Sequence, residues 1–206
     1  MIEDINNKIL FIRHGESLSN EKKESLQYIP DCRIPLTPKG RVQADLLGEF
    51  LSSVIEKDVN IQVLYSPFDR AKQTKEIVLE HFNTNSVIQD KEDYRIREVD
   101  IGNFISDFER IRKEREEYGN KFFYRFPNGE SCADVCNRVY PLLKEFEELE
   151  KIPTLIFSHA ATINVFRMLL TNATVAEFNK LDKPANCSIF SYHRDKKEFK
   201  QERTSS

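Results

Sequence analysis

Basic side chains that could bind phosphate stand directly after short apolar segments of this chain. Residues 9–12 are all apolar, and Arg13, His14 and Gly15 follow them at once. The apolar run predicts a buried strand, and ligands of open α/β sheets bind beyond the carboxyl ends of the strands. Arginine offers a planar cationic fork for an oxyanion, and a neutral histidine offers a nucleophilic nitrogen. The tripeptide alone also fits a plainer interpretation, in which a structural histidine lies beside a surface arginine.

The same arrangement occurs twice more along the chain. Residues 59–65 predict a strand, and Arg70 follows at the start of a predicted helix. Residues 153–158 predict another strand, and His159 follows it directly. An arginine in the first turn of a helix adds its charge to backbone N–H groups that also favour an anion. We therefore expect these side chains to converge with the first basic pair on one anion site.

Two carboxylates lie close together in one charged segment. Glu98 and Asp100 belong to Arg97-Glu98-Val99-Asp100-Ile101-Gly102, which resembles the acid loop of the family named below, and this resemblance makes Glu98 the candidate general acid and Asp100 its rival. An acid must reach the atom that receives its proton, so the choice between the two depends on geometry and stays open here. A solvated charge cluster is the plainer interpretation, because most carboxylates are exposed. Asn20 adds an amide donor close to the first basic pair.

Two helices with clear start signals are predicted to pack beside these strands. Thr37 as N-cap, followed by proline, predicts a helix over 38–54. A Ser-x-x-Asp pattern resembling a capping box opens a second helix over 131–151. Pro141 lies inside this second segment and is expected to kink or break it.

The remaining segments complete an alternating pattern. Residues 103–130 are interpreted as an inserted helical cap, with a charged helix over 103–119 and then an aromatic and basic stretch. Residues 187–192 predict the last strand, and the charged tail from Asp195 is expected to be mobile. About five strands alternate with helices, which predicts an α/β three-layer sandwich with a mostly parallel central sheet. The whole chain, 1–206, is expected to form a single domain.

Composition narrows the class of protein. Of the 206 residues 39% are hydrophobic and 32% are charged, with a net charge of -3, so there is no basic excess to attract nucleic acid. The N-terminus lacks the pattern of a signal peptide, and no apolar stretch reaches the length of a membrane span. We therefore expect a cytoplasmic protein with no membrane partner. The cysteines lack the spacing of a zinc site and are interpreted as reduced thiols; they are Cys32, Cys132, Cys136 and Cys187.

Several segments together resemble a known family. Arg13-His14-Gly15-Glu16 is similar to the signature of the histidine phosphatase superfamily, which includes the cofactor-dependent phosphoglycerate mutases. The other family motifs follow in order, namely Leu36-Thr37-x-x-Gly40, Ser66-Pro67 with Arg70-Ala71-x-Gln73-Thr74, Arg97-Glu98 with Gly102, Gly129-Glu130-Ser131, and Ser158-His159. The resemblance extends from about Ile9 to Tyr192 and implies a phosphoglycerate mutase-like fold.

The resemblance implies a role for each candidate residue. It implies that His14 attacks phosphorus to form a phosphohistidine, and that Glu98 protonates the leaving alcohol and then activates water. It implies that Glu130 helps to orient the site. Catalysis is assigned in this way to His14, Glu98 and His159, and substrate binding to Arg13, Asn20 and Arg70, with no metal and no cofactor.

Departures from the family pattern favour a phosphatase over a mutase. Ser19 stands where the mutases typically carry tryptophan, and the acid loop lacks their glutamate-arginine-histidine-tyrosine-glycine sequence. Ala160 replaces the glycine that usually follows the second histidine, which leaves the geometry of that loop open. We expect a phosphomonoesterase acting on a small phosphate ester. A phosphoglycerate mutase and a non-catalytic phospho-ligand-binding module remain as alternatives, and the oligomeric state is left open, with a homodimer as one option.

Overall fold

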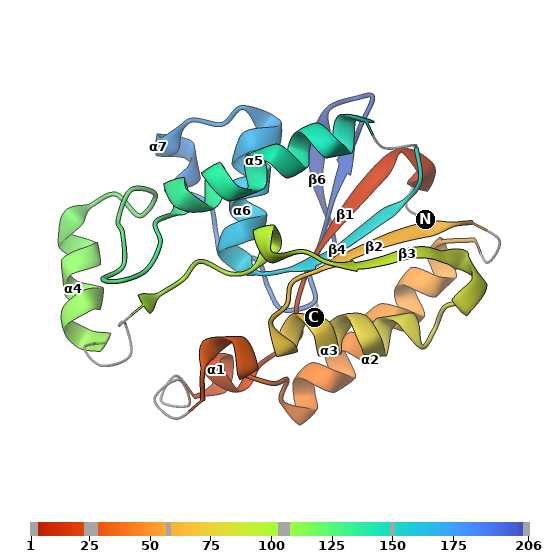
Figure 1. Cartoon of the computed structure of the whole chain (residues 1–206), viewed down its shortest axis with the longest axis horizontal. Coiled ribbons are helices and arrows are strands. Elements are labelled where there is room, and N and C mark those ends of the chain that lie inside the picture. Colours follow the sequence, from red (N-terminus) through yellow and green to blue (C-terminus); the bar gives the residue numbers. More distant parts are fainter. Residues whose placement is uncertain (1–3, 23–28, 57–58, 103–107, 149–150, 204–206) are drawn as a thin grey trace.

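A six-stranded sheet forms the centre of the protein (Figure 1). The computed structural model describes residues 4–22, 29–56, 59–102, 108–148 and 151–203. The strand order is β3-β2-β4-β1-β5-β6, in which the first four strands run parallel, β5 pairs antiparallel with β1, and β6 pairs antiparallel with β5. The strands are β1 (Lys8–Arg13), β2 (Ile61–Tyr65), β3 (Val87–Glu92), β4 (Thr154–Ser158), β5 (Ile189–His193) and β6 (Glu198–Arg203).

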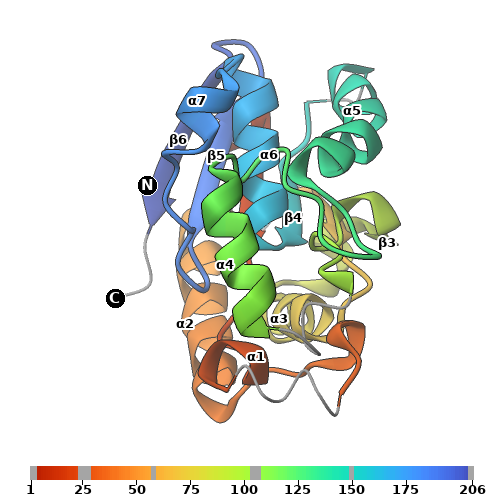
Figure 2. The same ribbon diagram turned by 90° about the vertical axis from the view of Figure 1, so that its left-hand side faces the viewer.

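Helices cover both faces of the sheet, so the predicted three-layer α/β architecture with a mostly parallel sheet is confirmed (Figure 1, Figure 2). One face carries α2 (Pro38–Val54) and α3 (Asp69–Leu79), and the other carries α5 (Cys132–Glu148) and α6 (Ala160–Thr171). The shorter helices are α1 (Leu18–Glu21), α4 (Phe108–Tyr118) and α7 (Val175–Phe178). Within the described ranges, none of these helices has both the length and the apolar character needed to cross a bilayer.

The side chains of β1 contribute alternately to two hydrophobic cores, one on each face of the sheet. Successive side chains of a strand point to opposite faces of its sheet. Ile9 and Phe11 therefore join the core under α5 and α6, whereas Leu10 and Ile12 join the core under α2 and α3. All four side chains are fully buried, which fits the near-continuous apolar sequence expected of a central parallel strand.

The predicted helix starts are confirmed by their hydrogen bonds. The hydroxyl of Thr37 accepts from the backbone N–H of Gly40 at 3.0 Å at the start of α2. Before α5, the backbone N–H of Ser131 donates to Asp134 at 2.7 Å, and the backbone N–H of Asp134 donates to the Ser131 hydroxyl at 3.2 Å. This reciprocal pair satisfies N–H groups that the helix itself leaves without partners.

One prediction about the C-terminal half is wrong, and another is narrowed by the structure. The chain beyond Asp195 contains β6, which pairs antiparallel with β5. Phe199 on β6 packs against Phe190 and Phe11 with ring centroids 5.8 and 5.7 Å apart, and this apolar contact anchors an otherwise charged edge strand. Of the kink or break expected at Pro141, the break does not occur: α5 continues through this exposed residue, where water can solvate the carbonyl that proline leaves unbonded, and the kink stays a prediction.

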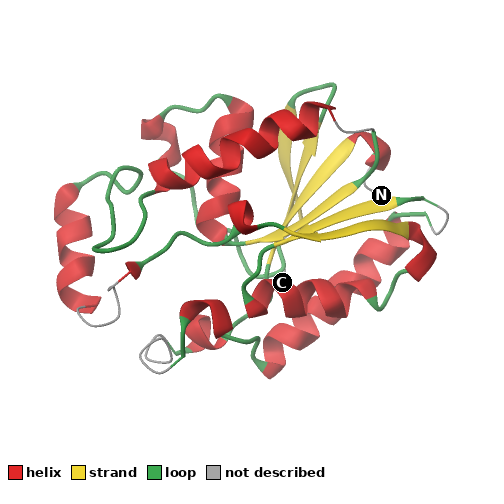
Figure 3. Ribbon diagram, in the orientation of Figure 1, coloured by secondary structure: helices red, strands yellow, loops and turns green. Residues whose placement is uncertain are grey.

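The expected cap is described only in part. Residues 103–107 lie outside the described ranges, and α4 confirms the rest of the helix predicted over 103–119. Figures 2 and 3 show α4 beyond the edge of the sheet where the parallel strands end. Ile111 of α4 is buried in the same core as Tyr124 and Phe126, whose rings meet edge to face 5.5 Å apart. The aromatic stretch therefore packs α4 onto the domain.

Candidate active site

Two buried imidazoles face each other where two neighbouring strands end. His14 follows β1 and His159 follows β4, and the two ring centroids lie 5.1 Å apart. The backbone N–H of His14 donates to the carbonyl of Ser158 at 3.1 Å, which continues the pairing of the two strands to their ends. The side chains are almost fully enclosed, at 3% and 0% exposure. The parallel register of β1 and β4 thus brings two histidines from distant parts of the chain into one site.

The environment of His14 determines which of its ring nitrogens carries a proton. Nδ1 lies 2.7 Å from the carbonyl oxygen of Gly15, which can only accept a hydrogen bond. A neutral ring must therefore be protonated at Nδ1, which leaves the lone pair on Nε2. The close turn that makes this contact needs glycine, because a Cβ on Gly15 would collide with the backbone of Gly40. His14 is thus held as the tautomer with a nucleophilic Nε2.

The ring of His159 is held at Nε2, whereas that of His14 is held at Nδ1. Its Nε2 lies 2.7 Å from the hydroxyl of Ser66, which also accepts from the backbone N–H of Phe68 at 3.3 Å. This arrangement suits a Ser66 hydroxyl that donates to Nε2 and so places the ring proton on Nδ1. Nδ1 is buried and has no partner among the described residues. It is therefore a donor available to an anion in the site.

Two buried guanidinium groups complete the cluster. Arg13 and Arg70 are each 4% exposed. Arg13 donates to the carbonyl of Pro184 at 2.6 Å and, more weakly, to Oδ1 of Asn20 at 3.4 Å. That oxygen of Asn20 also accepts from Asn186 at 3.0 Å, so the side-chain NH₂ of Asn20 remains as its donor. Arg70, in the first turn of α3, donates to Asp31.

Burial and charge keep both histidines neutral. The pKa of His14 is lowered well below its usual value, first by burial and then by the charges of Arg70 and Arg13. Burial also lowers the pKa of His159, followed by the same charges and by His14. The pKa of Arg13 falls to about 10 through burial, while the carboxylate of Glu98 opposes this change, so Arg13 remains a cation near neutral pH. The site therefore combines two neutral imidazoles with two cations.

The lowered histidine pKa values predict that acid destabilises the fold. In the unfolded chain both imidazoles take up protons near pH 6.5, whereas the folded protein resists protonation until lower pH. The unfolded state then binds more protons, so the free energy of unfolding should fall as the pH drops below 6.5, by up to about 1.4 kcal/mol per pH unit for each histidine. Urea unfolding between pH 7.5 and 5 measures this slope. His159→Gln should make it shallower, and equal slopes in the two proteins would contradict the assignment.

Of the two candidate acids, Glu98 has the better position. Glu98 is half-buried and close enough to Arg13 for its charge to raise the pKa of that group. Asp100 is exposed, and its carboxylate accepts from the backbone N–H of Gly102 at 2.8 Å within its own turn. The carboxylate of Glu98 also accepts locally, from the backbone N–H of Val99 at 3.0 Å, so Glu98 is distinguished by its lower exposure and by its effect on Arg13, and its role as the acid stays a prediction.

A partly buried ion-pair network holds the loop that carries Glu98. Arg138 of α5 donates to the backbone carbonyls of Arg95, Arg97 and Glu98, the last two at 2.9 and 3.1 Å. It also pairs with Glu130, at 3.2 Å from Nε. Glu130 in turn accepts from the side chain of Arg97 at 2.6 Å and from the backbone N–H of Asp100 at 3.1 Å. Glu130 therefore binds the loop of residues 97–100 at two points, which fixes the backbone on either side of Glu98.

We expect Arg138→Met to lower the free energy of unfolding by about 3–5 kcal/mol. The substitution removes one cationic partner of Glu130, and three backbone carbonyls lose the hydrogen bond that they accept from Arg138. Chemical denaturation measures this change. Arg125→Met is the matched control, since Arg125 is 61% exposed and its ion pair with Asp134 lies at the surface. The control should cost less than about 1 kcal/mol. Similar losses in the two variants would show that the network does not stabilise the loop.

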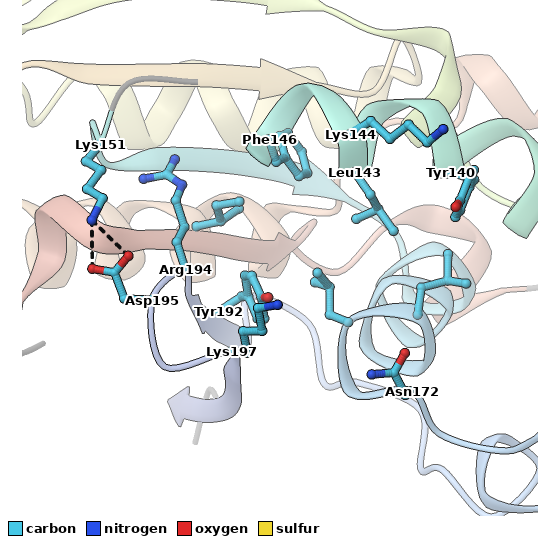
Figure 4. A pocket seen from close by; sticks show the side chains of 13 residues that line it. Tyr140, Leu143, Lys144, Phe146, Lys151, Asn172, Tyr192, Arg194, Asp195 and Lys197 are labelled. Carbon is cyan, nitrogen blue, oxygen red and sulfur yellow. Dashed lines mark hydrogen bonds and ion pairs between the residues drawn. The ribbon is translucent and has the colours of Figure 1, made fainter. Parts of the chain in front are cut away.

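Two hollows differ in their relation to this cluster. One, of about 340 Å³, opens beside Arg13 and Asn20 and is also lined by Lys183 and Asn186. The other, of about 640 Å³, lies near the start of β1 and the end of β5 (Figure 4). In the second hollow Arg194 donates to the backbone carbonyls of Asn6 and Ile152, and Lys151 pairs with Asp195 at 2.8 Å. The hollow beside Arg13 is therefore the one that adjoins the basic cluster.

The structure brings Arg13, His14, Arg70 and His159 together, and it places Asn20 and Glu98 beside Arg13. The sequence interpretation missed the contributions of Asp31, Asn186 and Arg138, because each of them contacts a segment that is distant in the sequence. Across the described ranges, no group of three or more His, Cys, Asp or Glu side chains could hold a metal ion.

This chain is similar to known proteins in sequence and in fold. The chain is 34% identical to the phosphoglycerate mutase-like protein AT74H of Arabidopsis thaliana, over 88% of this chain and 72% of that one. It is 28% identical to the broad-range acid phosphatase DET1 of Saccharomyces cerevisiae, over 88% and 83% of the two chains. It shares its fold with a mycobacterial glucosyl-3-phosphoglycerate phosphatase solved with VO₃, at a TM-score of 0.74 and 20% identity over 97% and 100%. A family model matches residues 9–205, so this chain belongs to the histidine phosphatase superfamily, branch 1.

Proposed function

We propose that this protein is a metal-independent phosphomonoesterase that acts on a small phosphorylated metabolite through a phosphohistidine intermediate. One observation carries the proposal: a neutral His14 with a free Nε2 faces His159 between two buried guanidinium groups. A phosphoryl group in transfer carries its charge on its equatorial oxygens, so cations and N–H donors around it stabilise the transition state. Arg13, Arg70 and His159 are the donors, with the amide of Asn20 beside them.

In the first step Nε2 of His14 attacks phosphorus and the P–O bond to the leaving alcohol breaks. The leaving oxygen takes a proton from the carboxyl group of Glu98, so that a neutral alcohol departs and Glu98 becomes a carboxylate. The hydrogen bond from Nδ1 of His14 to Gly15 keeps the ring oriented and shares the positive charge that develops on it. The product of this step is a phosphohistidine at position 14.

In the second step water takes the place of the alcohol. The carboxylate of Glu98 removes a proton from water while the water oxygen attacks phosphorus, and the P–N bond breaks. Orthophosphate leaves, His14 regains its lone pair at Nε2, and Glu98 is again protonated. Arg138 acts on both steps indirectly, because it holds the backbone of the loop that carries Glu98.

The relatives support a phosphatase and keep one alternative open. The named activities among them include a broad-range acid phosphatase and a glucosyl-3-phosphoglycerate phosphatase. Another relative is named a phosphoglycerate mutase-like protein, which keeps mutase activity as the second candidate. A mutase must retain the phosphoryl group and return it to an acceptor, whereas a phosphatase passes it to water. A non-catalytic phosphate-binding module would need neither the nucleophile nor the acid.

The test measures phosphate released from p-nitrophenyl phosphate and from a panel of phosphorylated metabolites, with EDTA present, between pH 5 and 7.5. We expect turnover that EDTA does not reduce, and a phosphoenzyme labelled at His14 that is trapped by an alkaline quench. A coupled enolase assay with and without bisphosphoglycerate tests the mutase alternative. Bisphosphoglycerate-dependent mutase activity without net hydrolysis would replace the proposal, and phosphate binding without any turnover would favour the binding module.

A further inference from the structure

Asp31 is the direct partner of the guanidinium that the proposed function assigns to phosphate binding. Its carboxylate oxygens accept from Nη1 and Nη2 of Arg70 at 3.0 and 3.3 Å, and its backbone carbonyl accepts from Nη1 at 2.6 Å. The Arg70 side chain is 4% exposed and that of Asp31 is 25% exposed. Three contacts from one residue fix both the position and the rotation of the guanidinium plane.

These contacts use one edge of the guanidinium and leave another unused. An arginine presents pairs of N–H groups along two edges, one formed by Nη1 and Nη2 and the other by Nε and Nη2. Asp31 occupies the first edge. The N–H groups of the second edge have no acceptor among the described residues. Two oxygens of a phosphoryl group fit such an edge with two parallel hydrogen bonds.

The segment that carries Asp31 is itself fixed beside the start of α3. Asp31 opens a short 3-10 helix, η3 (Asp31–Arg33), in which the backbone N–H groups of Arg33 and Ile34 donate to the carbonyls of Pro30 and Asp31 at 2.8 and 3.3 Å. The ring of Phe68 lies 4.9 Å from the guanidinium carbon of Arg70 and 5.2 Å from the ring of His159. Arg70 is therefore held between the carboxylate of Asp31 and an aromatic ring that also contacts the second histidine.

We propose that Asp31 is a positioning residue that turns the Nε–Nη2 edge of Arg70 toward the phosphoryl oxygens. This inference rests on the proposed function, in which Arg70 binds those oxygens. The carboxylate also pairs with Arg70, whose charge repels the buried Arg13. This pairing lowers the electrostatic free energy of holding both guanidinium groups in the empty site. Asp31 thus contributes to phosphate affinity without touching the phosphate.

The test is a double-mutant cycle on orthophosphate binding, measured by calorimetry on the full chain. Asp31→Asn keeps the size of the side chain and removes the paired carboxylate oxygens, and we expect it to weaken orthophosphate binding on the order of tenfold. It should raise KM for a phosphate ester by a similar factor. In the Arg70→Ala background the same substitution should have no further effect, because its action passes through the guanidinium.

Asp69→Asn is the matched control, because it removes a carboxylate next in sequence to Arg70 that pairs with Arg33 instead. It should leave orthophosphate affinity unchanged. Unchanged affinity in Asp31→Asn would overturn the inference, as would equal effects with and without Arg70. Tighter binding would overturn it too, by showing that Asp31 competes with phosphate.

Two further results keep the inference separate from the proposed function. If Asp31→Asn does not fold, Asp31→Glu takes its place, since one added methylene shifts the carboxylate and should also weaken binding. Wild-type protein that neither hydrolyses esters nor binds orthophosphate would overturn both ideas. Wild-type protein that hydrolyses esters while Asp31→Asn binds orthophosphate equally well would overturn only the role of Asp31.

Discussion

Replacing His14 by alanine should abolish phosphate release, with kcat/KM reduced by at least about 10⁴-fold. The reason lies in the chemistry of the first step, because the unprotonated Nε2 of His14 is available for attack, whereas the unprotonated Nε2 of His159 already accepts from the hydroxyl of Ser66. Orthophosphate should still bind, since both guanidinium groups and His159 remain. Steady-state hydrolysis of p-nitrophenyl phosphate measures the loss, and labelling with an alkaline quench should show that the phosphoenzyme is absent.

His81→Ala is the matched control for this substitution. His81 lies near the surface beyond the end of α3 opposite to Arg70, and its ring pairs with Asp45 at 2.8 Å. It should retain wild-type turnover and phosphoenzyme formation. A His14→Ala protein that remains active within about tenfold of wild type would show that the nucleophile is another group or water itself, and the two-step mechanism would then be wrong.

The neutrality of His14 also bears on the pH at which the enzyme works. Because the folded environment lowers its pKa well below 6.5, the ring stays unprotonated in mildly acidic solution. The lone pair on Nε2 of His14 therefore stays available at a pH at which an exposed histidine would be protonated. This property suits a phosphatase that is active below neutral pH, and it arises from burial and from the neighbouring arginines.

The parts of this site that follow strand ends could be predicted from sequence. A buried parallel strand has a distinctive apolar pattern, so the positions just after it can be recognised before any fold is known. Arg13, His14 and His159 were found in this way. Arg70 was found because it follows the turn after β2 and begins a helix. The convergence of these residues then follows from the shared carboxyl edge of parallel strands.

The contacts that orient those residues could not be predicted in the same way. Asp31 reaches Arg70 from an irregular segment, and Arg138 reaches the acid loop from the middle of α5. Neither position has a local pattern that separates it from an ordinary surface charge. Their roles depend on which segments lie side by side in space. The choice between Glu98 and Asp100 was open for the same reason, since both carboxylates occupy one short loop.

The charged tail shows a different reason for a wrong prediction. Charge and a terminal position favoured a mobile segment, whereas the residues from Asp195 turn back into β6. An edge strand exposes one side to water, so charged side chains are compatible with it and even protect it from further pairing. The single aromatic ring of Phe199 supplies the buried contact. Composition alone could not distinguish these two outcomes.

Removing the guanidinium of Arg70 should have the second largest effect. We expect Arg70→Met to lower kcat/KM by about 10²–10³-fold, comparable to the loss of an oxyanion donor elsewhere. The substitution should also change the pH dependence, because the charge of Arg70 is the largest electrostatic cause of the lowered pKa of both histidines. Without it their pKa values rise, so the acid limb of kcat/KM should move to higher pH.

Arg70→Lys separates charge from shape. A lysine keeps the positive charge but loses the planar fork, so it should keep the position of the acid limb while activity still falls. Arg33→Met is the control, because Arg33 is 71% exposed and pairs with Asp69 outside the buried cluster. It should change neither the rate nor the pH profile. If Arg70→Met lost activity with its acid limb unmoved, the guanidinium would bind the phosphoryl group without tuning the histidines. The neutrality of His14 would then have to arise from burial and Arg13 alone.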